Sequence, residues 1–329
     1  YYSYNTPTDY YTNLFYGDLN NVRDRTKNLM VRNTVGLTLR EGFNKWAQMG
    51  IALYATHQLK TYTLPTLGTD TVGQKRYNEN TLYVGGRLSR TQGKLIHYDI
   101  NGEVAVVGDE VGNFDVNGTA TLDLRISKRD TLQVEVNAFI QDLDPDFYFQ
   151  HYHSQFLWWD NDLDKETRTR IEGTFSYEKT KTTLRVAIEE IQNYTYLGMS
   201  YTAADETHQQ FAAGFRQHSG NINILTAQLD QKLTLGPLHW DNLVTYQSSS
   251  NEDVLPLPTL NVFSNLYLKF LVASVLSVEL GASATWFTEY DAPDFCPMLN
   301  QFAVQENEDT RMKLGNFPFV DVYAILHLK

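Results

Sequence analysis

The chain of 329 residues is poor in cysteine, in basic charge and in long apolar runs. Its one cysteine excludes a disulfide scaffold and any cysteine-based zinc or iron–sulfur centre. Lys and Arg number 27 against 39 Asp and Glu, without a clustered basic stripe, which argues against nucleic-acid binding because phosphates require concentrated positive charge. The longest charge-poor apolar stretch, Phe270 to Val278, is far shorter than the roughly 20 residues of a transmembrane helix.

Aromatic residues are abundant, and apolar residues recur at every second position. Aromatics make up 13% of the chain and charged residues 20%, which is the composition of a folded protein. Ile96, Ile100 and Val104 alternate with polar residues such as Asp99 and Glu103, and no helical spacing of three and four is found. The alternation occupies residues 94–107, 114–126, 131–141 and 277–286. Each run lasts about 11–14 residues, whereas soluble strands stop at about 5–6 and a tilted strand crosses a bilayer in about 9–11.

Short turns and long connections follow one another along the chain. Short turns are expected around residues 41–44, 90–93, 127–130, 178–181, 236–237 and 272–274. Longer connections are expected at 64–78, 143–165, 197–219, 250–259 and 290–312, with a brief one at 108–112. This order is typical of an antiparallel up-and-down barrel, which suits a bilayer because hydrocarbon offers the backbone no hydrogen-bond partners.

We therefore expect an all-β fold, an antiparallel up-and-down transmembrane β-barrel of about 14 or more strands. Residues 1–28 are expected to form an N-terminal loop or strand segment, and residues 29–329 a single barrel domain. About thirteen strands can be counted, whereas single-chain bacterial barrels have even numbers, so we expect only part of a larger barrel, truncated at both ends. The expected location is the bacterial outer membrane, with short turns periplasmic and long loops extracellular.

Two local features belong to these predicted strands. A Gly85-Gly86 pair inside one strand indicates a bend, a bulge or a close approach within the wall. Aromatic residues near strand ends suit the girdles at the membrane–water interfaces. They are Trp46, Tyr62, Tyr77, Tyr177, Tyr194, Trp240, Tyr246, Trp286 and Tyr290.

Several short segments carry a family resemblance. They are residues 41–45 (EGFNK), 77–86, 92–98 (QGKLIHY), 151–161, 238–242 (LHWDN), 253–258 (DVLPLP) and 264–270 (SNLYLKF). In these segments the chain resembles the putative porin family of Bacteroidetes outer membranes, from about residue 28 to the end. The resemblance implies an outer-membrane barrel, and because family members look longer, with strands at both ends, it agrees with the expected truncation.

The polar sides of the predicted strands carry charges of both signs. The side chains expected to line a pore are Arg87, His97, Asp99, Glu103, Asp115, Asp123, Arg125, Glu135, Arg168, Arg170, Glu172, Arg185 and Glu279, accompanied by Arg32, Glu189 and Lys269. Burying so many charges in a dry core would cost more than their pairing recovers. The interior is therefore expected either to hold water, as a channel with charge selectivity, or to be plugged by a dense ion-paired network.

The long connection at 143–165 contains two groups that are candidates for ligand contact. His151 and His153 share a face if they lie on one strand, with Asp160 nearby, but no third metal ligand is fixed by spacing. Trp158 and Trp159 offer either a stacking platform for sugars or aromatic solutes, or anchors that pack the loop. For both groups we favour the structural interpretation, and we assign no metal site.

These observations predict a porin-like barrel that allows passive diffusion of small hydrophilic solutes, without a cofactor and without enzymatic activity. No nucleophile-elbow, zinc-helix or Walker pattern occurs, and Cys296 is given no catalytic role. The expected partners are outer-membrane lipid, small hydrophilic solutes and other outer-membrane proteins. One alternative is a non-conducting barrel subunit that binds partner proteins in an outer-membrane complex. A second is a soluble all-β carbohydrate-binding domain.

Overall fold

The computed structural model describes residues 25–43, 49–66, 73–92, 96–127, 130–154, 157–203, 209–296 and 298–328. Its long strands are β1 (Lys27–Leu39), β2 (Gly50–Thr66), β3 (Gly73–Arg90), β4 (Ile96–Gly108), β5 (Phe114–Arg125), β6 (Thr131–Leu143), β9 (Glu166–Tyr177), β10 (Thr182–Ala203), β11 (Gln209–Leu235), β12 (Leu238–Ser249), β13 (Leu260–Val272), β14 (Leu276–Phe287) and β19 (Phe319–Leu328). Short strands lie in the connections: β7 (His151–His153), β8 (Trp158–Asp160), β15 (Tyr290–Asp291), β16 (Asp294–Cys296), β17 (Gln301–Gln305) and β18 (Lys313–Leu314).

Helical structure is limited to three short segments in the described residues. They are α2 (Phe147–Gln150), η1 (Glu178–Thr180) and η2 (Glu308–Thr310). Within the described part of the chain, no helix is long and apolar enough to cross a membrane.

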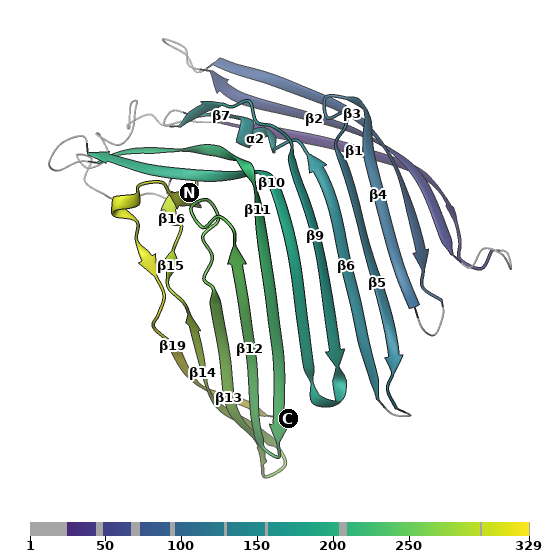
Figure 1. Cartoon of the computed structure of the whole chain (residues 1–329), viewed down its shortest axis with the longest axis vertical. Helices are drawn as coiled ribbons and strands as arrows, with labels where there is room; N and C mark the ends of the chain where they lie inside the picture. The colour runs from purple at the N-terminus through teal and green to yellow at the C-terminus, as the bar shows by residue number, and fades with distance from the viewer. Residues whose placement is uncertain are drawn as a thin grey trace.

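The long strands form one antiparallel sheet in which neighbours in sequence are neighbours in space. The order is β1-β2-β3-β4-β5-β6-β9-β10-β11-β12-β13-β14-β19, and β17 adds beside the upper part of β10. Figure 1 shows the sheet curving into a trough, with the purple β1 and the yellow-green β19 at opposite edges. In the described residues, β1 pairs only with β2 and β19 only with β14. The predicted up-and-down antiparallel architecture is therefore confirmed.

The strand register separates the side chains into an apolar face and a polar face. Ile100 on β4 lies opposite Gly118 on β5, which lies opposite Ala138 on β6. One residue away, Asp99 lies opposite Thr119. Side chains alternate across a strand, so these two rows occupy opposite faces. Most of the apolar face is exposed in the isolated chain, as expected of a surface that contacts lipid.

Long and short connections lie at opposite ends of the sheet (Figure 1). Tight turns such as Gly236-Pro237, where Gly236 has a φ of 59°, join the strands at one end. At the other end, the connection 144–165 agrees with its prediction, whereas those expected at 64–78 and 197–219 are wrong in extent because strands occupy most of them. Backbone pairing there continues beyond the alternating apolar residues, as between Thr66 and Gly73.

The upper part of β10 and β11 has a small core of its own. Leu197, Met199, Cys296 and Ala303 are buried together, so β10 packs against the segment that carries β16 and β17. A side chain enclosed between two protein segments need not follow the apolar–polar alternation of a lipid-facing wall. This explains why the period of two fades here although the strands continue.

The glycine pair in β3 marks a close approach, as one of the predicted alternatives stated. A Cβ atom on Gly85 would lie 2.4 Å from Cζ of Tyr54, whose ring covers this glycine from the neighbouring strand β2. The Tyr54 hydroxyl continues to β4 and donates a hydrogen bond to Asn101 Oδ1 at 2.9 Å. Gly85 therefore provides the space that lets one tyrosine connect three strands.

The aromatic girdle is confirmed only in part by the placement of the rings. Trp240 and Tyr246 lie exposed on the apolar face of β12, where an interfacial ring is expected. Tyr62 and Tyr77 instead lie on the polar face and pack against Phe147 of α2, so their assignment to a lipid-facing girdle was wrong. Trp46 lies outside the described residues.

Candidate functional site

The polar face extends across the sheet from β1 to β14. The strand register places on it all the side chains that were predicted to line a pore, together with Arg32, Glu189 and Lys269. One row runs from Arg87 through Asn101, Asn117 and Phe139 to Arg170. Their role as pore-lining groups remains a prediction, but the geometry brings them together on one surface.

This face lies on the concave side of the sheet at its β1 edge. Arg32 on β1 donates a hydrogen bond of 2.9 Å to Glu103 on β4, across the two intervening strands. The guanidinium carbon of Arg32 also lies 5.7 Å from the centre of the Tyr83 ring on β3. Neighbouring strands are about 4.8 Å apart, so curvature toward the polar face helps one ion pair to span three strand intervals.

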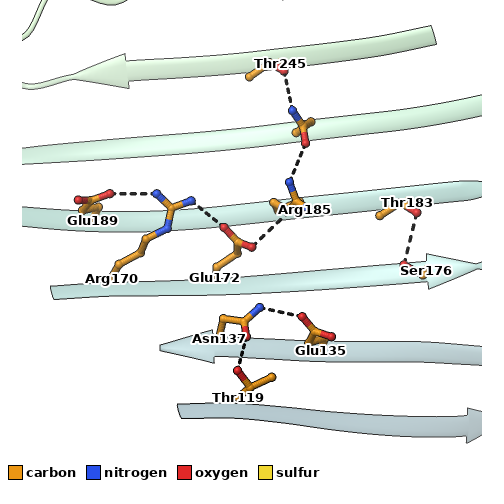
Figure 2. A network of polar contacts seen from close by, with 11 residues as sticks. Thr119, Glu135, Asn137, Arg170, Glu172, Ser176, Thr183, Arg185, Glu189 and Thr245 are labelled. Carbon is orange, nitrogen blue, oxygen red and sulfur yellow. Dashed lines mark hydrogen bonds and ion pairs between the residues drawn. The ribbon is translucent and has the colours of Figure 1, made fainter. Parts of the chain in front are cut away.

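The central part of the face is a network of ion pairs between β9 and β10 (Figure 2). Arg170 donates to Glu189 at 3.0 Å and to Glu172 at 2.6 Å, while Arg168 pairs with Glu189 from the other side. Arg185 approaches Glu172 at 3.2 Å. Glu189 is buried, and a buried carboxylate needs such compensation because removing it from water is costly.

Neutral polar groups extend the same network to neighbouring strands. Arg185 donates to Gln228 on β11 at 3.0 Å, and Gln228 donates to Thr245 on β12 at 3.1 Å. On β5 and β6, Thr119 donates to Asn137 at 2.7 Å, and Asn137 donates to Glu135 at 2.8 Å (Figure 2). In this part of the sheet the polar face is therefore held by local hydrogen bonds and ion pairs.

Further ion pairs and hydrogen bonds hold other members of the predicted set on the flanking strands. Arg87 donates to Asp99 at 2.8 Å, and Lys269 lies 3.2 Å from Glu279. Asp115 accepts a hydrogen bond from Asn117 at 2.6 Å, and Asp123 accepts one from Gln133 at 3.4 Å. His97 and Arg125 lie on the same face by register.

The connection between β6 and β9 folds over the polar face instead of pointing away from it. Phe147 of α2 stacks on Tyr62 of β2, with ring centres 3.8 Å apart and planes 7° apart. Leu64 is buried in the same cluster. At the other side of the trough, Gln217 on β11 accepts from the Asp164 N–H at 3.0 Å and donates to the Asp164 carbonyl at 2.8 Å. This loop therefore contacts both β2 and β11, which are far apart in the sheet.

An acidic cavity of about 600 Å³ lies between this loop and the wall formed by β1 to β5. Its charged lining consists of Arg32, Lys60, Glu79, Glu103, Asp109, Glu110, Asp115, Asp144 and Asp146. Lys60 lies 2.5 Å from Glu110 and 3.7 Å from Glu79, so it neutralises only part of this charge. The lining has seven carboxylates and two basic groups, so a cation is favoured there.

The two histidines of the loop meet one aspartate. In the hairpin of β7 and β8, His151 Nδ1 lies 2.8 Å and His153 Nε2 lies 2.9 Å from the same Asp160 oxygen, Oδ1. Burial works to raise the pKa of Asp160, but the hydrogen bonds from both histidines outweigh it and hold that pKa below its ordinary value. No grouping of three or more His, Cys, Asp or Glu side chains among the described residues is placed to hold a metal ion.

The adjacent tryptophans have different surroundings. Trp158 stacks on His153, with ring centres 3.7 Å apart, and is otherwise exposed. Trp159 is buried, stacks on Tyr152 at 4.6 Å and meets Phe215 of β11 edge-on at 5.7 Å. Trp159 therefore joins the loop to the wall, as the anchoring alternative stated, while it also lines a cavity.

Sequence reasoning did not include Lys60, Tyr83 and Glu110 in the site. The polar face carries Tyr62 and Leu64 on β2 and Tyr77 on β3, so the apolar–polar alternation is too weak to assign faces there. Glu110 lies in the brief connection between β4 and β5 and returns to meet Lys60 and the Tyr83 hydroxyl. Only the path of this turn, which no period in the sequence encodes, reveals these contacts.

The fold is similar to that of solved outer-membrane receptors. The chain aligns with the ferric enterobactin receptor PfeA of Pseudomonas aeruginosa, a mutant in complex with enterobactin, at a TM-score of 0.59 and 13% identity, covering 93% of this chain and 49% of that one. For the siderophore receptor PirA of the same organism the values are 0.53, 14%, 81% and 48%. For the copper transporter OprC they are 0.57, 12%, 92% and 48%. The chain thus spans about half the length of these receptor chains.

Sequence comparison assigns the family. No curated protein sequence matches the chain. A family model described as "Putative porin" matches residues 1–329. The match covers the whole chain, and the antiparallel sheet with one apolar and one charged face is the architecture of an outer-membrane β-barrel. The chain belongs to the putative porin family of outer-membrane β-barrel proteins.

Proposed function

We propose that the chain forms the wall and the constriction of a channel through which small hydrophilic solutes diffuse passively across the outer membrane. In this proposal the long loops are extracellular. The observation that carries this proposal is the charged polar face, which runs over every long strand from β1 to β14 opposite an apolar face. Arg32, Arg87 and Lys269 remain about half exposed although each is paired. Such groups suit a water-filled lumen, and diffusion through it requires no catalytic group or cofactor.

The loop between β6 and β9 supplies the constriction in this proposal. It bridges from Tyr62 on β2 to Gln217 on β11, so a solute that moves along the polar face must pass beside it. Lys165 near its end also donates a hydrogen bond to the Val111 carbonyl at 3.1 Å. A loop fixed at several points narrows the passage without closing on each solute.

The charge beside the loop predicts a preference for cations. Seven carboxylates face two basic groups in the cavity of about 600 Å³, and a low-dielectric wall strengthens the resulting negative potential. In contrast, the network on β9 and β10 balances Glu172 and Glu189 with three arginines. Selectivity is therefore expected to arise at the acidic cavity rather than at the arginine network.

The test is conductance of the full-length protein in planar lipid bilayers. Stable open steps, with a reversal potential in a KCl gradient that shows cation preference, are expected. Glu110→Gln should shift the reversal potential toward the unselective value, because it removes one carboxylate beside Lys60. A protein that inserts correctly but never conducts would refute the channel and favour the non-conducting partner-binding subunit.

A second variant tests the loop. Phe147→Ala removes the ring that stacks on Tyr62 and should raise conductance and current noise, since the loop loses its contact with β2. The matched control is Phe175→Ala on the apolar face of β9, which should leave conductance unchanged. An unchanged conductance in Phe147→Ala would show that this loop does not limit the passage.

A further inference from the structure

A second cavity, of about 310 Å³, lies at the loop end of the sheet and shares no lining residue with the acidic cavity. Five aromatic side chains line it, namely Tyr148, Phe149, Tyr152, Trp159 and Phe215. Binding pockets for small molecules typically have volumes of about 300–1,000 Å³ and aromatic walls with few polar groups. In size and lining the cavity resembles a binding site for one or two rings.

The aromatic rings are held in place by one another. Tyr152 stacks on Trp159 with planes 20° apart, and Phe149 stacks on Phe215 at 4.0 Å with planes 19° apart. The indole N–H of Trp159 donates to the Tyr148 carbonyl at 3.1 Å, which fixes the orientation of that ring. These contacts join protein groups to one another, so each wall of the cavity supports its neighbour.

Four separate segments of the chain build the cavity, one of them being Thr26 just before β1. The β6–β9 loop supplies four of the rings, β11 supplies Phe215, and the connection after β16 supplies Met298 and Leu299. Met298 and Leu299 pack against the buried cluster around Met199 and Cys296, as Phe215 also does. A pocket supported by a buried core keeps its shape, and this favours recognition over nonspecific adhesion.

The chemistry of the lining selects the ligand. The face of an aromatic ring carries partial negative charge and attracts polarised C–H groups. Thr26 and Gln301 add neutral polar groups to the cavity, and its described lining residues include no basic side chain that would balance an anion. A ring with C–H faces, hydroxyl groups at its rim and no negative charge meets all three conditions.

We propose that this cavity binds a neutral pyranose unit of a soluble saccharide at the entrance of the channel. The inference rests on the proposed function for the expectation that hydrophilic solutes arrive there. The cavity would hold the sugar ring against Tyr152 and Phe215 and raise its local concentration beside the constriction. Of the two adjacent tryptophans, this assigns ligand contact to Trp159 and not to Trp158.

The experiment measures binding of maltotriose to the full-length protein in detergent by calorimetry and by tryptophan fluorescence. Saturable binding is expected, and sorbitol, a polyol without a ring face, should not compete. Tyr152→Leu and Phe215→Leu should each weaken binding about tenfold. Tyr246→Leu removes a ring of the same kind from the apolar face and should leave the affinity unchanged. Near-ultraviolet circular dichroism confirms that each variant is folded.

Several results would overturn the assignment of a pyranose site to this cavity. Absence of maltotriose binding, equal affinity in Tyr152→Leu and the parent protein, or displacement of the sugar by sorbitol would each refute a pyranose site. Binding of indole without binding of maltotriose would also refute it. Because the measurement is made in detergent, binding without conductance would sustain the site and refute passive diffusion, and conductance without binding would do the reverse.

Discussion

The free-energy cost of an arginine substitution should distinguish a face of the wall that contacts lipid from a face that contacts water. Val136 on β6 and Thr121 on β5 lie side by side near the middle of their strands but on opposite faces, since Val136 lies opposite Ala120 and Thr121 opposite Glu135. Val136→Arg would place a cation in hydrocarbon, at a cost of about 2–4 kcal/mol at the bilayer midplane. This corresponds to a change of about 30-fold to 700-fold in the folding equilibrium.

Thr121→Arg should behave differently if the polar face contacts water. The new guanidinium would lie beside Glu135 and could pair with it, and an exposed pair of this kind contributes only about 0.2–1 kcal/mol. We therefore expect the free energy of unfolding of Thr121→Arg to stay within about 1 kcal/mol of the parent protein. Val136→Leu, which keeps the apolar character, is the control for the substitution itself.

The assay is urea-dependent folding into phospholipid vesicles, followed by tryptophan fluorescence and by electrophoretic mobility. A cost below about 1 kcal/mol for Val136→Arg would refute the assignment of its face to lipid. An equally large cost for Thr121→Arg would refute a hydrated interior and indicate a dry, ion-paired plug.

Three further predictions concern the loop end and the turns. Met199→Ala should destabilise the upper part of β10 by about 2–5 kcal/mol, because it leaves a cavity in the buried cluster. It should also speed maleimide labelling of Cys296, whose thiol is buried in that cluster and has a raised pKa because of this burial. Because the pKa of Asp160 is lowered, its ionised carboxylate stabilises the β7–β8 hairpin above the ordinary carboxyl range, and this stabilisation is lost as the pH falls through the lowered pKa. Amide hydrogen exchange in the hairpin should therefore accelerate in acid in the parent protein. Asp160→Asn should show no such step. Replacing Ala273 and Ser274, with φ of 49° and 59°, by Asn and Gly should raise the midpoint of urea unfolding, because this turn favours those residues.

The wall of the structure could be predicted from the sequence because its information is local. The alternation around Ile100 and Asp99 assigns their faces without any knowledge of distant residues, and the strand register agrees with it. Even here a bulge intervenes: pairing passes from Leu82–Val107 to Tyr83–Ala105, so Val106 has no partner on β3 and ends the predicted alternation.

The loop contacts could not be predicted because they join residues that are distant in sequence. No spacing in the sequence predicts that Phe147 stacks on Tyr62 or that Gln217 forms hydrogen bonds with the backbone of Asp164. The adjacent pair Trp158 and Trp159 shows the same limit at short range. Because neighbouring residues of a strand point to opposite sides, a platform of two tryptophans becomes one anchor in the cavity and one ring outside it.

The hairpin of β10 and β11 has two environments along its length, an exposed apolar face and a packed protein core. Ile188 is 62% exposed on the apolar face, whereas Met199, eleven positions later on the same strand, is 1% exposed within a protein core. Lipid chains are fluid and adapt to any aliphatic group, but a close-packed cluster accepts only side chains of matching volume. Natural variants are therefore expected to drift freely at Ile188 and to conserve size at Met199. The irregular pairing between Gln192 and Tyr194 lies between these two positions on β10 and separates the exposed stretch from the one packed in the protein core.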